Sequence, residues 1–393
     1  MKTVGVFFGS RSPEHDVSIV TAQLIIDGLK KLNYPVVPVY INKSGNWLIG
    51  EELGNLKNFT DEGIKIGDEK KYQQYFLDLE QSRGKIVFRK KGIGGKTVII
   101  DIAFPAFHGS FGEDGTMQGL FEMFQIPYIG CGVAASAVSM DKAFVKQLCC
   151  SENIPTTKFV FVNKTDWKNI KPEVLEKISK LNFPLFVKPV HLGSSIAISK
   201  VGDKKDLDEK IEVAFYYDEK IIVEESVNNL MDVTCCVIGN KELIASELQE
   251  SAFSAELFDF EEKYLKDGGT QLGKSENGLI IPARLDDKIS NEIKNTAKTV
   301  YKLVGCSGIA RVDFLFDKEA EKFFVNEINP LPGTLYHHLW KASGIEFSDL
   351  LDKLIIYAED RHKNEQDLSF TFKSSLLTNL NSQKLNSKKL KGD

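Results

Sequence analysis

A predicted β-hairpin in the last third of the chain constrains the fold more than any other stretch. Its first arm is Gly308 to Asp317 and its second is Lys322 to Pro330, and both alternate apolar and polar residues with the period of two that strands show. The polar turn between them, residues 318–321, is short enough to join an antiparallel pair. The hairpin therefore predicts two adjacent strands whose facing residues follow from the turn.

Symmetric pairing about Ala320 places Asp313 opposite Glu327 and Arg311 opposite Asn329, with all four on one face. Two carboxylates directly opposite each other repel, so a fold that holds them there needs a cation between them. Asp, Glu and Asn oxygens suit Mg²⁺, which proteins hold with one or two carboxylates and substrate phosphates. For the hairpin considered alone, a solvated polar face is the alternative interpretation.

Length and composition place the chain among globular proteins. With 393 residues, 42% hydrophobic and 27% charged, it can bury substantial cores and is long enough for two or three domains. The net charge of -5 gives no general reason to expect nucleic acid as a partner. The six cysteines form no C-x-x-C pair, so neither a zinc site nor a redox motif is predicted.

The N-terminus and the hydropathy pattern predict a cytoplasmic protein without a membrane partner. The apolar run after Met1 is too short for a signal peptide and has no small-residue cleavage site behind it. No stretch reaches the roughly eighteen apolar residues that a membrane span needs.

The first segment predicts a parallel α/β domain. Val4 to Phe8 has the pattern of a buried strand, residues 9–16 that of a loop, and Val17 to Lys31 that of an amphipathic helix. Ligands of such sheets bind at the carboxyl ends of the strands, where this loop lies. Because the loop lacks G-x-G-x-x-G, a dinucleotide-dependent oxidoreductase is not expected.

Three further stretches carry polar groups at predicted strand ends. Phe107 to Leu120 is rich in glycine and contains His108 and Glu113; it is either a well-bonded turn or part of a site. The strand Leu185 to Pro189 contains Lys188 and precedes Gly193-Ser194-Ser195, whose donors suit phosphate oxygens, unless the loop is only a β-turn. The strand Lys220 to Val227 ends in Glu224 and Glu225, which either contact adenine and ribose or are solvated.

The long non-repetitive segment from Phe258 to Leu279 is functional or disordered, and its aromatic residues argue against disorder. Asp286 to Val304 and Ser348 to Ala358 are predicted helices, and the Ser-, Asn- and Lys-rich end from Lys373 is a predicted flexible tail.

Taken together, these stretches resemble the D-alanine–D-alanine ligases, a family of ATP-grasp enzymes, over roughly residues 1–360. The matching motifs occur in the family's order: Pro13 to Ser18, His108-Gly109 with Glu113 to Thr116, Ser139 to Lys142, Val187-Lys188-Pro189, Gly193-Ser194-Ser195, Phe258-Asp259-Phe260 with Lys263-Tyr264, Arg311-Val312-Asp313, and Asn326 to Asn329 with Pro332-Gly333. Each motif is modest alone, but their joint order is highly specific.

The resemblance implies a three-domain ATP-grasp fold of the α/β class, with α+β character in its C-terminal part and a Rossmann-like parallel sheet at the N-terminus. The implied domains are 1–139 for substrate binding, 140–223 as the central subdomain, 224–362 as the C-terminal subdomain, and 363–393 as a flexible tail. ATP lies between the two subdomains, and the implied cofactors are ATP and Mg²⁺, with Mn²⁺ possible. The family's dimeric members imply a possible homodimer.

The resemblance also assigns roles to residues. It implies catalytic or positioning roles for Glu14, Ser194, Tyr264, Arg311 and Gly333; ATP contacts for Lys142, Lys188, Ser195, Glu224, Glu225, Val227 and Lys263; metal ligation by Asp313, Glu327 and Asn329; and substrate contacts for Glu14, His108, Glu113, His338 and Leu339. The metal set agrees with the hairpin pairing derived above.

The implied reaction joins two D-alanine molecules for peptidoglycan synthesis through an acyl phosphate. A carboxylate is a poor electrophile, so it is first phosphorylated by ATP and then attacked by the second amine. Tyr264 favours an amine acceptor, because the related ligases that form a D-lactate ester lack that tyrosine. A nucleotide-binding protein without turnover is a further alternative, against which the intact Lys188, Asp313 and Glu327 argue.

Two positions depart from the family's pattern. Ala197 replaces a glycine of the phosphate loop, a small change if its φ is negative. His338 replaces a serine that holds the second substrate's carboxylate, and an ordinary histidine titrates near neutrality. The alternative function is therefore a ligase that joins D-alanine to a different acceptor amino acid.

Overall fold

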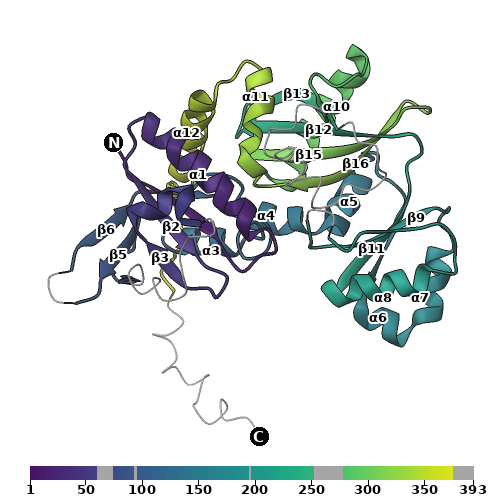
Figure 1. Cartoon of the computed structure of the whole chain (residues 1–393), viewed down its shortest axis with the longest axis horizontal. Coiled ribbons are helices and arrows are strands. Elements are labelled where there is room, and N and C mark those ends of the chain that lie inside the picture. The colour runs from purple at the N-terminus through teal and green to yellow at the C-terminus, as the bar shows by residue number, and fades with distance from the viewer. Residues whose placement is uncertain (60–73, 93–94, 194–195, 252–277, 375–393) are drawn as a thin grey trace, which may run out of the picture.

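In this computed structural model the described residues form four sheets, two in the N-terminal region, one in the central region and one in the C-terminal region (Figure 1). The structure describes residues 1–59, 74–92, 95–193, 196–251 and 278–374. In Figure 1 the N-terminal region lies on the left, the five-stranded sheet at the upper right and the central sheet at the lower right.

The N-terminal sheet has the order β3-β2-β1-β7, in which β1 pairs in parallel with both β2 and β7. These strands are β1 (Val4–Gly9), β2 (Val36–Ile41), β3 (Trp47–Ile49) and β7 (Ile102–Pro105). Every residue of β1 is buried, as expected for a parallel strand that is covered on both faces. The predicted buried strand and parallel sheet are therefore confirmed.

Helix α1 (His15–Lys31) follows β1 after a short loop. It packs against the C-terminal helix α12 (Phe347–Gln366). Ile25 and Ile26 of α1 share one core with Leu351 of α12. A Cβ added at Gly28 would lie 2.5 Å from the Leu351 side chain, so glycine lets the two helices approach closely.

The remaining N-terminal elements include a second sheet, of three strands in the order β4-β5-β6. They are the antiparallel β4 (Tyr75–Leu77), β5 (Ile86–Lys90) and β6 (Thr97–Ile100), the short turns η1 (Glu51–Gly54) and η2 (Leu56–Phe59), and the helices α3 (Thr116–Met123) and α4 (Val133–Met140).

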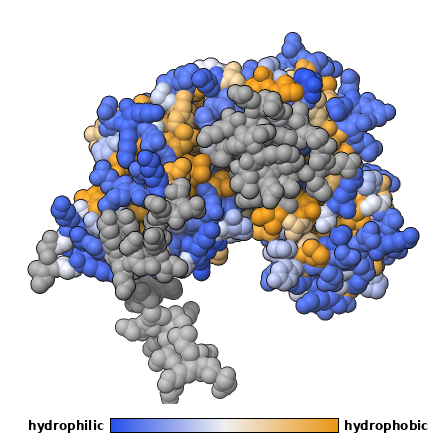
Figure 2. Space-filling view, viewed as in Figure 1, coloured by the Kyte–Doolittle hydropathy of each residue, from blue (hydrophilic) through white to orange (hydrophobic). Residues whose placement is uncertain are grey.

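The central sheet is antiparallel, with the order β10-β9-β11-β8. Its elements are β8 (Phe159–Asn163), β9 (Leu185–Pro189), β10 (Ser199–Val201), β11 (Lys220–Glu225) and the helices α6 (Lys164–Asn169), α7 (Lys171–Ile178) and α8 (Leu207–Tyr217). Alternate residues of β9 and β11, such as Val187 and Val223, pack against Ile211 of α8. The outer surface of this region is largely hydrophilic in the space-filling view (Figure 2), as expected for helices with one face in solvent.

The C-terminal sheet is also antiparallel and has the order β14-β13-β12-β15-β16. Its elements are β12 (Leu230–Gly239), β13 (Ile244–Ser251), β14 (Leu279–Ile280), β15 (Gly308–Asp317) and β16 (Lys322–Asn329), followed by η5 (Gly333–Tyr336) and α11 (His337–Ala342). Helix α10 (Asp287–Val304) packs on it through Ile293, Ala297 and Val300, and α5 (Lys142–Ser151) shares the same core through Val145.

The predicted hairpin is β15–β16, and its pairing is confirmed at the end that carries the polar residues. Asp313 lies opposite Glu327, and Arg311 lies opposite Asn329.

That pairing depends on a β-bulge, and symmetric pairing about the turn did not predict the bulge. Near the turn Phe314 lies opposite Val325, one position away from symmetry about Ala320, and the register shifts between Asp313 and Phe314. Asn326 is the extra residue of this bulge. If the pairing from the turn continued without the bulge, Asp313 would face Asn326 instead of a second carboxylate.

Several predicted segments lie wholly or partly outside the described residues. Ser194 and Ser195 of the predicted phosphate loop, most of the segment from Phe258 to Leu279, and most of the tail from Lys373 are among them. Within the described ranges, no helix combines the length and apolarity needed to cross a membrane.

Candidate active site

One cavity collects residues that lie far apart in the sequence. Eight of the predicted site residues line it, namely Glu14, His108, Glu113, Lys142, Arg311, Glu327, Asn329 and Gly333. They come from the loop before α1, the segment after β7, the start of α5 and the β15–β16 hairpin with the segment behind it. Gly193 of the predicted phosphate loop also lines the cavity, so all three sheet regions contribute to it.

Two basic side chains compensate the facing carboxylates of the hairpin. The Arg311 guanidinium donates to Asp313, with Nε 2.9 Å from Oδ2 and a terminal nitrogen 2.7 Å from the same oxygen. The Lys142 ammonium lies 3.1 Å from Oε2 of Glu327. Arg311 is 5% exposed and Asp313 and Glu327 are half-buried, so this face is not the solvated polar face that was the alternative.

The donor set of this hairpin fits a hard divalent cation. Asp313 and Glu327 present carboxylate oxygens from adjacent strands, and the Asn329 amide lies one side-chain repeat further along β16. In the part of the chain that the structure describes, no group of three or more His, Cys, Asp or Glu side chains is arranged so that it could hold a metal ion by itself. A site here would thus depend on the amide oxygen and on ligand phosphates besides the two carboxylates.

The N-terminal wall of the cavity is held by buried hydrogen bonds. The ring Nε2 of His108 lies 2.8 Å from Thr21 Oγ1, and the same hydroxyl oxygen accepts from the backbone N–H of Thr334 at 3.1 Å. Glu113 Oε2 accepts from the Gly109 N–H at 2.6 Å, and Oε1 lies 3.8 Å from His108 Nδ1. Burial raises the pKa of Glu113, although His108 works in the opposite direction. This network connects α1 with the segment that follows Gly333.

That segment has an unusual backbone. Thr334, Leu335 and Tyr336 have φ values of 50°, 55° and 50°, in the left-handed region where residues other than glycine are strained. Leu335 and Tyr336 are buried in the core that α1 and α12 share, and the Arg311 guanidinium lies 5.0 Å from the Tyr336 ring centre. Packing therefore holds the strained turn beside Gly333 and Arg311.

A second charge network lies on the central sheet and includes Lys146 and Thr157, which the sequence did not single out. Glu224 forms ion pairs with Lys188 and with Lys146, the latter at 2.8 Å. Thr157 Oγ1 accepts from Lys146 and donates to Glu224, both at 2.8 Å. Burial alone would raise the pKa of Glu224, but the two lysines outweigh it and the pKa is lowered. Glu224 is 2% exposed, so the solvated strand end that was the alternative is wrong for it.

The other predicted residues have different placements. Glu225 accepts from the backbone and side-chain nitrogens of Asn182 at 2.9 Å, and Val227 is half-buried just after β11. Ser194, Ser195, Lys263 and Tyr264 lie outside the described residues.

Comparison with known proteins identifies the family. A model of the D-Ala–D-Ala ligase C-terminus matches residues 148–356, and one of the N-terminus matches residues 3–131. The D-alanine–D-alanine ligase of Thermosipho melanesiensis is 39% identical over 94% of this chain and 97% of its own length. That of Caldicellulosiruptor bescii is 38% identical over 94% of this chain and 98% of its own length.

The chain belongs to the D-alanine–D-alanine ligase family.

Known structures of the family agree with the fold described above. The D-alanine–D-alanine ligase of Coxiella burnetii superposes with a TM-score of 0.75 at 27% identity and covers 93% of this chain and 96% of its own. The D-Ala:D-Ser ligase of Enterococcus faecalis superposes with a TM-score of 0.74 at 33% identity and covers 91% of this chain and 99% of its own. The predicted α/β architecture of the ATP-grasp type is therefore confirmed.

The structure describes both departures from the family's pattern. Ala197 has φ 56°, so the condition of a negative φ is not met and the alanine is strained where the family has glycine. His338 does not titrate near neutrality, because burial and then the neighbouring His337 lower its pKa to about 4. Its Nε2 lies 2.7 Å from Gln249 Oε1, its Nδ1 has no hydrogen-bond partner among the described residues, and the adjacent Leu339 is fully buried.

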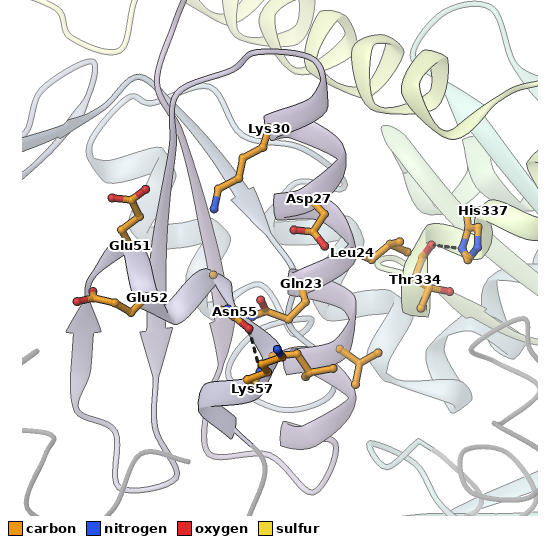
Figure 3. A pocket seen from close by; sticks show the side chains of 13 residues that line it. Gln23, Leu24, Asp27, Lys30, Glu51, Glu52, Asn55, Lys57, Thr334 and His337 are labelled. Atoms are coloured by element: carbon orange, nitrogen blue, oxygen red, sulfur yellow. Dashed lines mark hydrogen bonds between the residues drawn. The ribbon is translucent and has the colours of Figure 1, made fainter. Parts of the chain in front are cut away.

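A second cavity of about 1120 Å³ lies on the outer side of α1, and none of the predicted site residues lines it (Figure 3). Asp27 and Lys30 of α1 line it together with Lys57. Thr334 and His337 also reach it, and His337 Nδ1 lies 3.4 Å from the Thr334 carbonyl oxygen. Thr334, the first residue of the strained segment, therefore lines the second cavity, and its neighbour Gly333 lines the first.

Proposed function

We propose that this protein is a D-alanine–D-alanine ligase that uses ATP to join two D-alanine molecules. The observation that carries the proposal is the single cavity lined by Glu14, Lys142, Arg311, Glu327 and Gly333. A carboxylate from the N-terminal region, a lysine from α5 and a charged hairpin meet there, which suits the binding of an amino acid next to nucleotide phosphates.

In the first step, a carboxylate oxygen of the first D-alanine forms a bond to the γ-phosphorus of ATP while the bond to ADP breaks. Glu14 holds the ammonium group of that substrate, and His108 and Glu113 support the wall beside it. Lys142, Lys188 and Lys263 hold the phosphates, together with donors of the loop that contains Ser195. Glu224, Glu225 and Val227 contact the adenosine part.

In the second step, the amine of the second D-alanine, after loss of a proton, attacks the carbonyl carbon of the acyl phosphate, and inorganic phosphate leaves. The Arg311 guanidinium and the Gly333 N–H stabilise the oxyanion that develops, since both are held before the reaction by packing and hydrogen bonds. Ser194 and Tyr264 position this amine, and Leu339 forms part of the acceptor's surroundings.

Asp313, Glu327 and Asn329 would hold Mg²⁺, or Mn²⁺ in its place. When bound, such an ion neutralises charge on the transferred phosphoryl group. In this proposal Arg311 and Lys142 compensate the two carboxylates when the ion is absent.

His338 is the residue that concerns the choice of the second substrate, the acceptor amino acid. With Nε2 donating to Gln249 Oε1, Nδ1 of the neutral imidazole carries no proton, so in this arrangement the ring can neither donate to an acceptor carboxylate nor form an ion pair with it. We place the reaction in peptidoglycan synthesis in the cytoplasm, with a homodimer as the working assembly.

The test is a direct one. The protein is incubated with ATP, Mg²⁺ and pairs drawn from D-alanine, D-serine, D-lactate and the L-amino acids, and phosphate release and product mass are measured. D-Ala-D-Ala as the dominant product is the expected outcome. Another dipeptide would replace this proposal with that of a ligase for a different acceptor, and absence of turnover with every pair would refute both.

A further inference from the structure

His191 occupies a charged position between the central sheet and the predicted phosphate loop, and the proposed reaction leaves it unassigned. It follows β9 by two residues and lies two residues before Gly193. Its ring Nδ1 lies 3.0 and 3.1 Å from the two carboxylate oxygens of Asp218, and its Nε2 lies 3.5 Å from Asp141 Oδ2. Its backbone N–H also donates to Asp218 at 2.8 Å.

Both ring nitrogens face carboxylates, and only the imidazolium form has an N–H on each nitrogen to donate to them. Hydrogen bonds to Asp141 and then Asp218 raise the pKa of His191 to about 9, so it is charged at neutral pH. The other charged group here is Lys220, whose Nζ lies 2.7 Å from Asp141 Oδ2. Asp141 comes from the junction of α4 and α5, Asp218 from the end of α8 and Lys220 from the start of β11.

Two neighbouring contacts connect residues 141–142 with residues 191–192. Asp141 directly precedes Lys142, and His191 directly precedes Leu192. While His191 faces Asp141, the Lys142 ammonium donates to the Leu192 carbonyl at 2.9 Å.

The second of these contacts reaches the cavity. The Lys142 ammonium also lies 3.1 Å from Glu327, and Gly193 is so close to Glu14 that an added Cβ would lie 3.0 Å from Oε2. The position of His191 and Leu192 therefore determines where Lys142 and Gly193 lie in the cavity.

We propose that His191, in its charged form, is a positioning residue that holds residues 190–193 and Lys142 ready for the phosphates of ATP. The inference rests on the proposed function, because it takes ATP as the ligand of that cavity. His191 acts through the loop and through Asp141, and it does not touch the reacting atoms.

The direction of the pH dependence follows from the raised pKa. A histidine whose folded pKa is raised contributes fully below its ordinary value of 6.5, and that contribution is lost as the pH rises through about 9. The affinity for ATP should accordingly fall above pH 8.

The experiment compares wild type with His191→Gln by calorimetric titration with a non-hydrolysable ATP analogue and Mg²⁺ between pH 7 and 10. Glutamine can donate one hydrogen bond but carries no charge. The expected loss of affinity at pH 7.5 is about two- to fivefold, which corresponds to a partly exposed ion pair. The ratio of the dissociation constants of His191→Gln and wild type should approach one at pH 10, where His191 of wild type has also lost its charge. The KM for ATP should rise in parallel while kcat at saturating ATP changes little.

A matched control and a rescue separate positioning from general damage. His362→Gln removes a histidine on α12 whose Nε2 lies 2.8 Å from the side-chain nitrogen of Gln366, and it should leave binding unchanged. His191→Lys keeps a positive charge, and we expect it to recover part of the affinity. Equal affinity of His191→Gln and wild type at pH 7.5, or a ratio that stays constant with pH, would overturn the inference. Failure of wild type itself to bind the analogue would instead refute the proposed function.

Discussion

Replacing Lys146 with methionine tests the buried charge network of the central sheet. Lys146 is 1% exposed, and its ammonium lies 2.8 Å from both Glu224 Oε2 and Thr157 Oγ1. Methionine fills a similar volume but carries no charge. The substitution leaves Glu224 buried with Lys188 as its remaining ion-pair partner and Thr157 as its hydroxyl donor.

The expected size of the effect follows from burial. Removing one partner of a buried ion pair destabilises a protein by about 3–5 kcal/mol, because the other charge is left uncompensated. Since Lys188 and Thr157 remain, we expect the lower end, about 3 kcal/mol. In a folding unit of about 150–250 residues this lowers Tm by roughly 6–12 °C.

The pH dependence has a defined sign. The lysines lower the pKa of Glu224 against the effect of burial, so the pair stabilises the fold above the ordinary value of 4.5 and the stabilisation is lost as the pH falls. The difference in the free energy of unfolding between Lys146→Met and wild type should therefore become smaller below pH 4.5.

Thermal unfolding followed by circular dichroism at pH 7.5 measures the effect. Lys177→Met is the matched control, since Lys177 is exposed on α7 and its loss should change stability by less than about 0.5 kcal/mol. A Tm for Lys146→Met within about 2 °C of this control would refute the reasoning. It would mean that Glu224 is either protonated or solvated without Lys146.

Three further predictions concern the active site. Glu327→Gln should abolish turnover while leaving Tm within a few degrees of wild type, because the residue is half-buried at the end of β16; near-normal phosphate release would contradict its metal role. Ala197→Gly should stabilise the protein by about 1 kcal/mol, because φ 56° suits glycine better, and an unchanged or lower denaturation midpoint would count against strain there. The His338 ring should remain neutral from pH 8 down to about pH 5 in an NMR titration, since its pKa is about 4, and protonation near pH 6.5 would show that the ring is solvated.

The local pattern was enough to predict the elements that carry the site. The alternation of the two hairpin arms predicted β15 and β16, and the pairing of Asp313 with Glu327 holds in the structure. Period-two alternation and a short polar turn are local properties, so they survive in the folded chain. The bulge at Asn326 was not predictable in this way, since it depends on how both strands continue into the sheet.

Prediction from the sequence missed residues that belong to no recognisable motif or periodic pattern. Lys146 is one charged residue on an amphipathic helix, and nothing near it in sequence indicates that Glu224 lies 2.8 Å away. The only signal was its polar character on the buried face of α5. The left-handed backbone from Thr334 to Tyr336 was likewise invisible, because none of these residues is glycine.

Two inferences depended on the ordinary properties of a residue type. Ala197 was a small change only on the condition of a negative φ, which is not met, and His338 was expected to titrate near neutrality, which it does not. The loop conformation decides the first and burial decides the second.

By itself, the sequence determined the class of the fold, the order of the motifs and the strands that present the carboxylates, because hydrophobic periodicity and turn residues act over a few positions. Only the tertiary structure decided which of those residues meet. It brought Glu14, Lys142 and Glu327 to one cavity, placed Lys146 on Glu224, and put His191 between Asp141 and Asp218. Charges separated by tens to hundreds of residues change one another's ionisation only at a few ångströms, and that proximity exists only in the packed chain.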